Sequence, residues 1–96
     1  MKNPVVIAKD ITLPDGSIVS NPHYFVVMAK DGDDFKGKMI THSKGGVSKR
    51  KTDLSEFAGF EPDSESYITI SKECKTSKNN VKKDGNKCKI FGWFLS

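Results

Sequence analysis

The sequence has little of what builds helices and membrane spans. It contains only three leucines and three alanines among 96 residues, and both are strong helix formers. Its longest uncharged apolar run, Tyr24 to Ala29, is far shorter than the roughly 20 residues of a transmembrane helix. No charged start followed by an apolar stretch marks a secretion signal. We therefore expect a soluble, cytoplasmic chain with no membrane partner and little helix.

Metal-ligating residues are equally scarce. The chain has two cysteines, Cys74 and Cys88, and two histidines, His23 and His42. A disulfide is not expected in a reducing compartment. No C-x-x-C or H-x-x-x-H pair is present to pre-organise a zinc site. The sequence therefore predicts no metal site and no cofactor.

What the chain does contain favours sheet. Seven isoleucines, seven valines and six phenylalanines are typical of pleated, half-buried surfaces. Residues 1–96 suffice for one domain and are too few for two. The spacing of turn signals predicts five or six short strands, with at most one short helix. We expect a mainly β domain that forms a small barrel or sandwich.

Individual segments predict the strands. Residues 23–29 are apolar on both alternating faces, which is typical of a central strand covered on each side, and residues 37–43 return as its hairpin partner. Residues 66–71 alternate, so Tyr67, Thr69 and Ser71 should form a wet face. The aromatic run 87–95, with Phe91 and Trp93, predicts a closing strand whose rings belong to the core rather than to a base-stacking surface. Asp53 with Glu56 three residues later suggests one capped helical turn.

Charge comes in blocks along the chain. Residues 36–51 carry six basic and no acidic side chains, and residues 52–65 carry five acidic and no basic ones. Residues 43–52 and 76–85 read as exposed basic loops. The side chains predicted to contact single-stranded RNA or another polyanion are Lys44, Lys49, Arg50 and Lys51. Because the chain has 15 lysines and one arginine, base reading through arginine is not expected.

Each block has an alternative interpretation. The basic block is also typical of a solvated surface that binds no polyanion. The acidic block is either a solvated face or a shield over the basic surface that a partner displaces. The sequence leaves both choices open.

Four segments resemble the PemK/MazF toxin family: PHYFVVM at 22–28, MITHSKG at 39–45, SYIT at 66–69 and CKIFGWFLS at 88–96. The resemblance implies an SH3-like barrel, often a homodimer, that cleaves single-stranded RNA without a metal and is neutralised by an antitoxin. It also implies that Thr41 and Ser43 contact the phosphate. The family tends to set an arginine on the later strand, but residues 67–71 hold none, and the only arginine is Arg50. A degenerate, inactive member of the family is therefore the alternative.

Histidine chemistry offers a substitute for that arginine. His42 lies between Thr41 and Ser43 at a strand end, and histidine is the side chain that changes charge near neutral pH. A hairpin between residues 23–29 and 37–43 brings His23 towards His42. We therefore predict a catalytic group of Thr41, His42, Ser43 and His23, the alternative being two ordinary histidines at strand ends.

Two non-enzymatic functions compete with this hypothesis. The first is a small barrel, such as a phage or mobile-element inhibitor, that binds a host protein or nucleic acid through its charged face. The second is an adaptor that pairs an exposed strand edge with a partner. The missing arginine favours a binding function, whereas the sequence Thr41 to Gly45 favours the nuclease.

Overall fold

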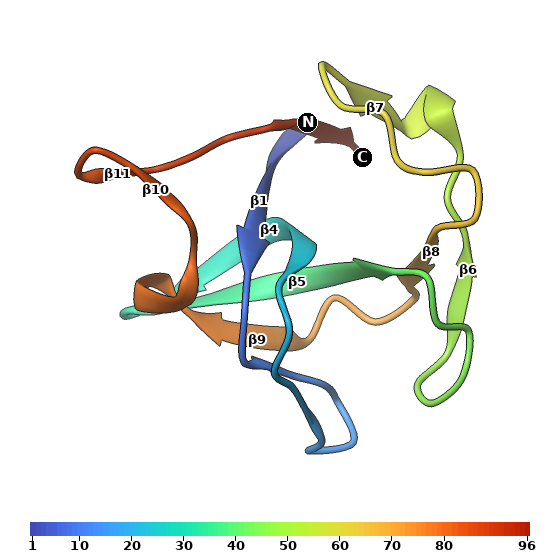
Figure 1. Ribbon diagram of the computed structural model, residues 1–96, viewed down its shortest axis with the longest axis horizontal. Helices are drawn as coiled ribbons and strands as arrows, with labels where there is room; N and C mark the ends of the chain where they lie inside the picture. Colours follow the sequence, from blue (N-terminus) through green and yellow to red (C-terminus); the bar gives the residue numbers. More distant parts are fainter.

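Twelve short β-strands and two single turns of 3₁₀ helix build the chain, as seen in a computed structural model that describes residues 1–96 (Figure 1). The strands are β1 (Lys2–Ala8), β2 (Ile11–Thr12), β3 (Ile18–Val19), β4 (His23–Asp31), β5 (Asp34–Thr41), β6 (Lys49–Lys51), β7 (Phe57–Ala58), β8 (Tyr67–Thr69), β9 (Cys74–Ser77), β10 (Lys83–Asp84), β11 (Lys87–Cys88) and β12 (Gly92–Leu95). The 3₁₀ turns are η1 (Leu54–Glu56) and η2 (Lys78–Asn80). Ten strands form one antiparallel sheet, and β10 and β11 form a separate hairpin. The prediction of a mainly β domain is confirmed.

The centre of the sheet is β4, which pairs with β1 on one side and with β5 on the other. Its side chains alternate between two cores, because Phe25 and Val27 belong to one hydrophobic cluster and Val26 to another. Phe25 and Val26 are both fully buried. The prediction of a central strand covered on both faces is therefore confirmed.

The two central strands approach so closely that one position requires glycine. Gly37 on β5 pairs with Val27 on β4. A Cβ built on Gly37 would meet the carbonyl oxygen of Val26 at 1.7 Å, which no side chain can tolerate. Gly37 thus allows the close approach beside the irregular pairing between Val27 and Ala29.

One of the two cores is encircled by strands. It takes one side chain from each of six strands, which are β1, β4, β5, β7, β8 and β12: Val5, Val26, Ile40, Phe57, Ile68 and Phe94. The pairing runs β6–β8–β5–β4–β1–β12–β7, and no pairing joins β6 to β7. The sheet is therefore not closed, and the seam between β6 and β7 is spanned only by residues 52–56, which include η1. Figure 1 shows this half of the molecule on the right.

The other core lies on the opposite face of the central strands. It contains Phe25, Met39, Ile11 and Cys74, which come from β4, β5, β2 and β9. Val81 closes this side by bridging to Ala8 of β1. Cys74 and Cys88 are both free thiols.

The strand count was wrong, because short pairings interrupt segments that were predicted to be loops. Lys49–Lys51 was expected in an exposed loop, yet it forms β6 and pairs with β8. The predicted loop 76–85 contains the end of β9, the 3₁₀ turn η2 and strand β10. A second helical turn was not expected. The η2 turn forms because the Ser77 hydroxyl accepts a hydrogen bond from the Asn79 amide at 3.2 Å.

The face assignment of residues 66–71 was right for Ile68, which is fully buried, but wrong for the next two residues. Thr69, expected on a wet face, is fully buried, and Ile70 is half exposed. The Thr69 hydroxyl accepts a hydrogen bond from the Met39 amide at 3.0 Å and donates one to the Ser71 carbonyl at 3.1 Å. A buried hydroxyl that makes both bonds carries little desolvation cost.

The predicted helical turn at residues 54–56 is present as η1. Asp53 caps it, accepting a hydrogen bond from the Ser55 amide at 3.0 Å. Glu56 was expected to complete a capping box, but its carboxylate binds Arg50 instead. Neither helical turn in the chain has the length or the apolar character needed to cross a membrane.

Candidate functional site

An open hollow of about 590 Å³ lies where β4 begins and β5 ends. One wall carries all four predicted catalytic residues, His23, Thr41, His42 and Ser43. The segment 60–63 and Ser66 form the other wall. The structure therefore brings the predicted residues together and adds a second wall that the sequence did not predict.

The register of the β4–β5 hairpin explains this gathering. Tyr24 pairs with Ile40, so the next step along the antiparallel ladder sets His23 across from Thr41. His42 and Ser43 follow directly where the chain leaves β5. The same hairpin that builds both cores thus holds the two histidines on one rim.

The His23 ring is held by the backbone of Asn21, two residues before it. Nδ1 lies 2.8 Å from the carbonyl oxygen of Asn21. Because a carbonyl oxygen only accepts hydrogen bonds, Nδ1 must carry the proton in this contact. In the neutral ring Nε2 then has a lone pair, so His23 is arranged to accept a proton.

His42 faces a carboxylate across the hollow. Its Nε2 lies 3.7 Å from Oδ2 of Asp63, a distance suited to an ion pair when the ring is protonated. The His42 side chain is 66% exposed and that of Asp63 57%, so solvent screens the pair. The arrangement leaves His42 accessible to a ligand in the hollow.

The two hydroxyls at this rim differ in accessibility. Thr41 is buried, and its Oγ1 accepts a hydrogen bond from the Ser43 amide at 3.2 Å. Ser43 is exposed. Thr41 therefore orders the turn that presents Ser43, and the Ser43 hydroxyl is the better placed of the two to contact a ligand.

The lining of the hollow is acidic and aromatic. Glu61 and Asp63 line it, and no lysine or arginine does. Tyr24 and Phe60 supply two aromatic rings. The sequence analysis missed these four residues, and its only signal for any of them was the acidic block at residues 52–65.

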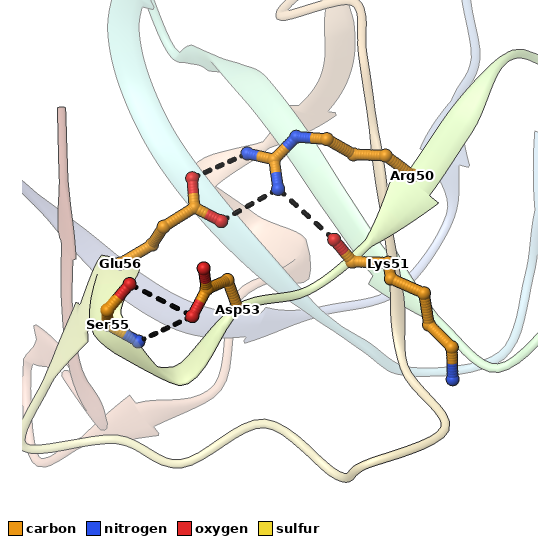
Figure 2. A network of polar contacts seen from close by, with 5 residues as sticks. All are labelled: Arg50, Lys51, Asp53, Ser55 and Glu56. Atoms are coloured by element: carbon orange, nitrogen blue, oxygen red, sulfur yellow. Dashed lines mark hydrogen bonds and ion pairs between the residues drawn. The ribbon is translucent and has the colours of Figure 1, made fainter.

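The basic segment, residues 44–51, is largely engaged with the chain itself. Figure 2 shows Arg50 paired with both oxygens of Glu56, at 2.7 Å from Nη1 to Oε1 and 2.6 Å from Nη2 to Oε2. These hydrogen bonds from Arg50 to Glu56 raise the pKa of the guanidinium above its usual value. Nη1 of Arg50 also donates to the carbonyl of Lys51 at 3.1 Å. Arg50 and Glu56 thus clamp the seam between β6 and β7.

The lysines of the basic segment differ in whether their ammonium groups have a partner within the chain. Lys51 Nζ donates to the Ser64 carbonyl at 3.0 Å and lies 5.1 Å from the centre of the Tyr67 ring. Lys49 Nζ donates to the Gly45 carbonyl. Lys44 is exposed and makes no ion pair. Of the four cations predicted to bind a polyanion, Lys44 alone has its ammonium uncommitted, and it follows Ser43 directly.

No group of three or more histidine, cysteine, aspartate and glutamate side chains is arranged to hold a metal ion. Comparisons of the chain with protein-family models, with curated proteins and with solved structures find no match.

Proposed function

We propose that this chain is a metal-independent endoribonuclease of the PemK/MazF type, which cuts single-stranded RNA in the hollow between β4, β5 and residues 60–63. One observation carries the proposal: His23, whose Nδ1 faces a backbone carbonyl, shares one rim with an accessible His42 and the Ser43 hydroxyl. Two histidines beside a hydroxyl are suited to general acid–base chemistry near neutral pH.

RNA fits this chemistry because it carries its own nucleophile, the ribose 2′-hydroxyl. His23 Nε2 takes the 2′ proton as the 2′ oxygen bonds to phosphorus. The bond from phosphorus to the 5′ oxygen breaks, and protonated His42 supplies the proton to that leaving oxygen. The products are a 2′,3′-cyclic phosphate and a free 5′-hydroxyl.

Ser43 and Lys44 have the remaining task of holding the phosphate. The Ser43 hydroxyl donates a hydrogen bond to a phosphate oxygen, and the adjacent Lys44 ammonium offsets its charge. Thr41 acts through Ser43 and is a positioning residue. Lys49, Arg50 and Lys51 are committed to the chain's own carbonyl and carboxylate oxygens and need not take part.

The finer points of the resemblance belong to the same proposal. A ring of six strands around one core, with a seam clamped by Arg50 and Glu56, is compatible with an incompletely closed SH3-like barrel. The expected partners are a second copy of the chain and an acidic antitoxin. An acidic antitoxin would compete with RNA for Lys44 and for the histidines.

A non-enzymatic binding function is the second candidate, and specific observations favour it. Glu61 and Asp63 line the hollow, and carboxylates repel a phosphate. No arginine lies on β8, where the family tends to set one. A phage or mobile-element inhibitor or adaptor that binds a protein would not need a cationic site.

The deciding experiment incubates the purified chain with a labelled single-stranded RNA and an excess of chelator. The nuclease predicts fragments that end in 2′,3′-cyclic phosphate, and no cleavage of the same strand carrying 2′-O-methyl groups, because methylation removes the nucleophile. Intact RNA at every protein concentration, with no growth arrest on expression, would contradict the nuclease and leave the binding function.

A further inference from the structure

Two aromatic rings, Tyr24 and Phe60, line the hollow beside the histidines. Tyr24, next to His23 on β4, is 36% exposed. Its ring meets that of Phe60 at a centroid distance of 4.7 Å and an angle of 61°. It also meets Phe91 at 5.6 Å and 82°. These edge contacts on two sides hold the Tyr24 ring in place at the hollow.

The carboxylates of Glu61 and Asp63, which lie on the same segment as Phe60, favour a particular kind of ligand. An ionised carboxylate only accepts hydrogen bonds, so Glu61 has nothing to offer a phosphate oxygen. The edges of RNA bases, by contrast, carry N–H donors. Guanine has two of them side by side on its Watson–Crick edge, N1–H and N2–H, which match the two oxygens of one carboxylate. Uracil offers a single N–H on that edge.

We infer that the hollow is a subsite for one unpaired guanine base of an RNA strand, which stacks on Tyr24 while Glu61 accepts hydrogen bonds from N1–H and N2–H. The inference rests on the proposed function, since it names the base that the nuclease holds next to the scissile phosphate. A volume of about 590 Å³ lies within the range of small-ligand sites. Single-stranded bases are commonly read by aromatic stacking together with hydrogen bonds to this edge.

The subsite also accounts for the acidic character of a site proposed to bind RNA. The Glu61 carboxylate lowers the affinity of the hollow for a phosphate and raises its affinity for a guanine edge. The phosphate then lies at the rim beside Ser43 and Lys44, where the Asp63 carboxylate faces His42. The acidic wall therefore selects the base, and the histidine rim acts on the backbone.

Binding of non-cleavable RNA tests the subsite separately from catalysis. The probes are two fluorescent 2′-O-methyl heptamers, one of uridines only and one with a central guanosine, with binding to the purified chain followed by anisotropy. We expect the guanosine heptamer to bind at least about tenfold more tightly. An inosine heptamer, which lacks the 2-amino group, should fall between the two.

Paired variants assign the roles. Tyr24→Leu should weaken binding of the guanosine heptamer by roughly 5- to 150-fold, the range of base–aromatic stacking, and Tyr24→Phe, which keeps the ring, should bind like wild type. The matched control is Tyr67→Leu, because Tyr67 lies on β8 outside the hollow. Glu61→Gln should abolish the preference for guanosine over uridine, whereas Glu65→Gln, also outside the hollow, should keep it.

The outcomes separate the two proposals. Equal affinity for both heptamers, or equal effects of Tyr24→Leu and Tyr67→Leu in variants whose circular dichroism matches wild type, would overturn the subsite even if wild type cleaves RNA. Guanosine-dependent binding that is lost in Glu61→Gln would support the subsite. If that binding occurs without cleavage of ordinary RNA, the subsite stands and the nuclease fails.

Discussion

The hollow at the histidine rim and the basic segment at residues 44–51 are neighbours in the sequence but differ in what their polar groups face. In the hollow, His42 and Ser43 are exposed to a common space. In the basic segment, Lys49, Arg50 and Lys51 all bond to oxygens of their own chain. A count of positive charges therefore overstates the surface available to a polyanion.

The difference has a structural cause. The histidines lie at the ends of two long strands whose register is fixed by buried residues on both faces. The cations lie on β6, a strand of three residues at the edge of the ring. Nearby carboxylate and carbonyl oxygens accept hydrogen bonds from the cations of β6. The Arg50–Glu56 pair also spans the seam between β6 and β7, where the sheet is not closed.

Removal of either histidine should have the largest effect. His23→Ala and His42→Ala should each lower kcat/KM for a single-stranded RNA by about 10²- to 10⁴-fold, the usual loss when a general acid or base is removed. Asp84→Ala, in the separate β10–β11 hairpin, serves as the control and should match wild type. Full activity in both histidine variants would show that the rim is not the catalytic centre.

Removing the Arg50–Glu56 ion pair, which spans the seam between β6 and β7, should lower the free energy of unfolding. Arg50→Ala should lower the free energy of unfolding by about 1 kcal/mol, because the pair is bidentate but partly exposed. For a domain of this size that loss corresponds to a fall of about 4–8 °C in Tm. Lys44→Ala, which breaks no contact, should leave Tm unchanged. A double-mutant cycle with Glu56→Ala that gives no coupling would contradict the clamp.

A smaller effect distinguishes the lysines in polyanion binding. Lys44→Gln should reduce the slope of log K against log salt for single-stranded RNA by about 0.7, the value of one phosphate contact. Lys51→Gln should leave the slope unchanged, because that ammonium is held by Ser64 and Tyr67. A larger reduction of the slope in Lys51→Gln than in Lys44→Gln would show that the RNA phosphates lie along β6 rather than at the rim.

The smallest effect is expected at the η1 cap. Hydrogen bonds from the Ser55 amide and hydroxyl lower the pKa of Asp53 below the usual value of an aspartate. A lowered pKa in the folded state contributes stability above the unfolded value, and this contribution is lost as pH falls through the folded value. Asp53→Asn should therefore lose less stability than wild type between pH 5 and pH 3, as measured by urea unfolding. An identical loss in both proteins would contradict the assignment.

The sequence predicted the strand whose residues are apolar on both faces. Phe25, Val26 and Val27 alternate between two cores, and that pattern indicated a central strand. Lys49–Lys51 contains no apolar residue, so nothing in it signalled β6, which exists because the edge of β8 is available for pairing. Thr69 looked like a surface residue because its partners, the Met39 amide and the Ser71 carbonyl, become known only from the fold.

The same distinction holds for the site. A hairpin was enough to predict that His23 and His42 approach each other, since both lie near its open end. Tyr24, Phe60 and Glu61 come together only because residues 59–66 fold back over the start of β4. That contact joins segments more than thirty residues apart, and neither periodicity nor a local motif encodes it.

The pH dependence of RNA cleavage tests the acid–base assignment most directly. If His23 is the base and His42 the acid, kcat/KM should rise and then fall from acidic to alkaline pH, because the base must be neutral and the acid protonated. His23→Ala should lose the rise on the acidic side, and His42→Ala should lose the fall on the alkaline side. A wild-type rate that does not change over this range, or a bell that persists unchanged in both variants, would contradict the assignment of catalysis to the two histidines.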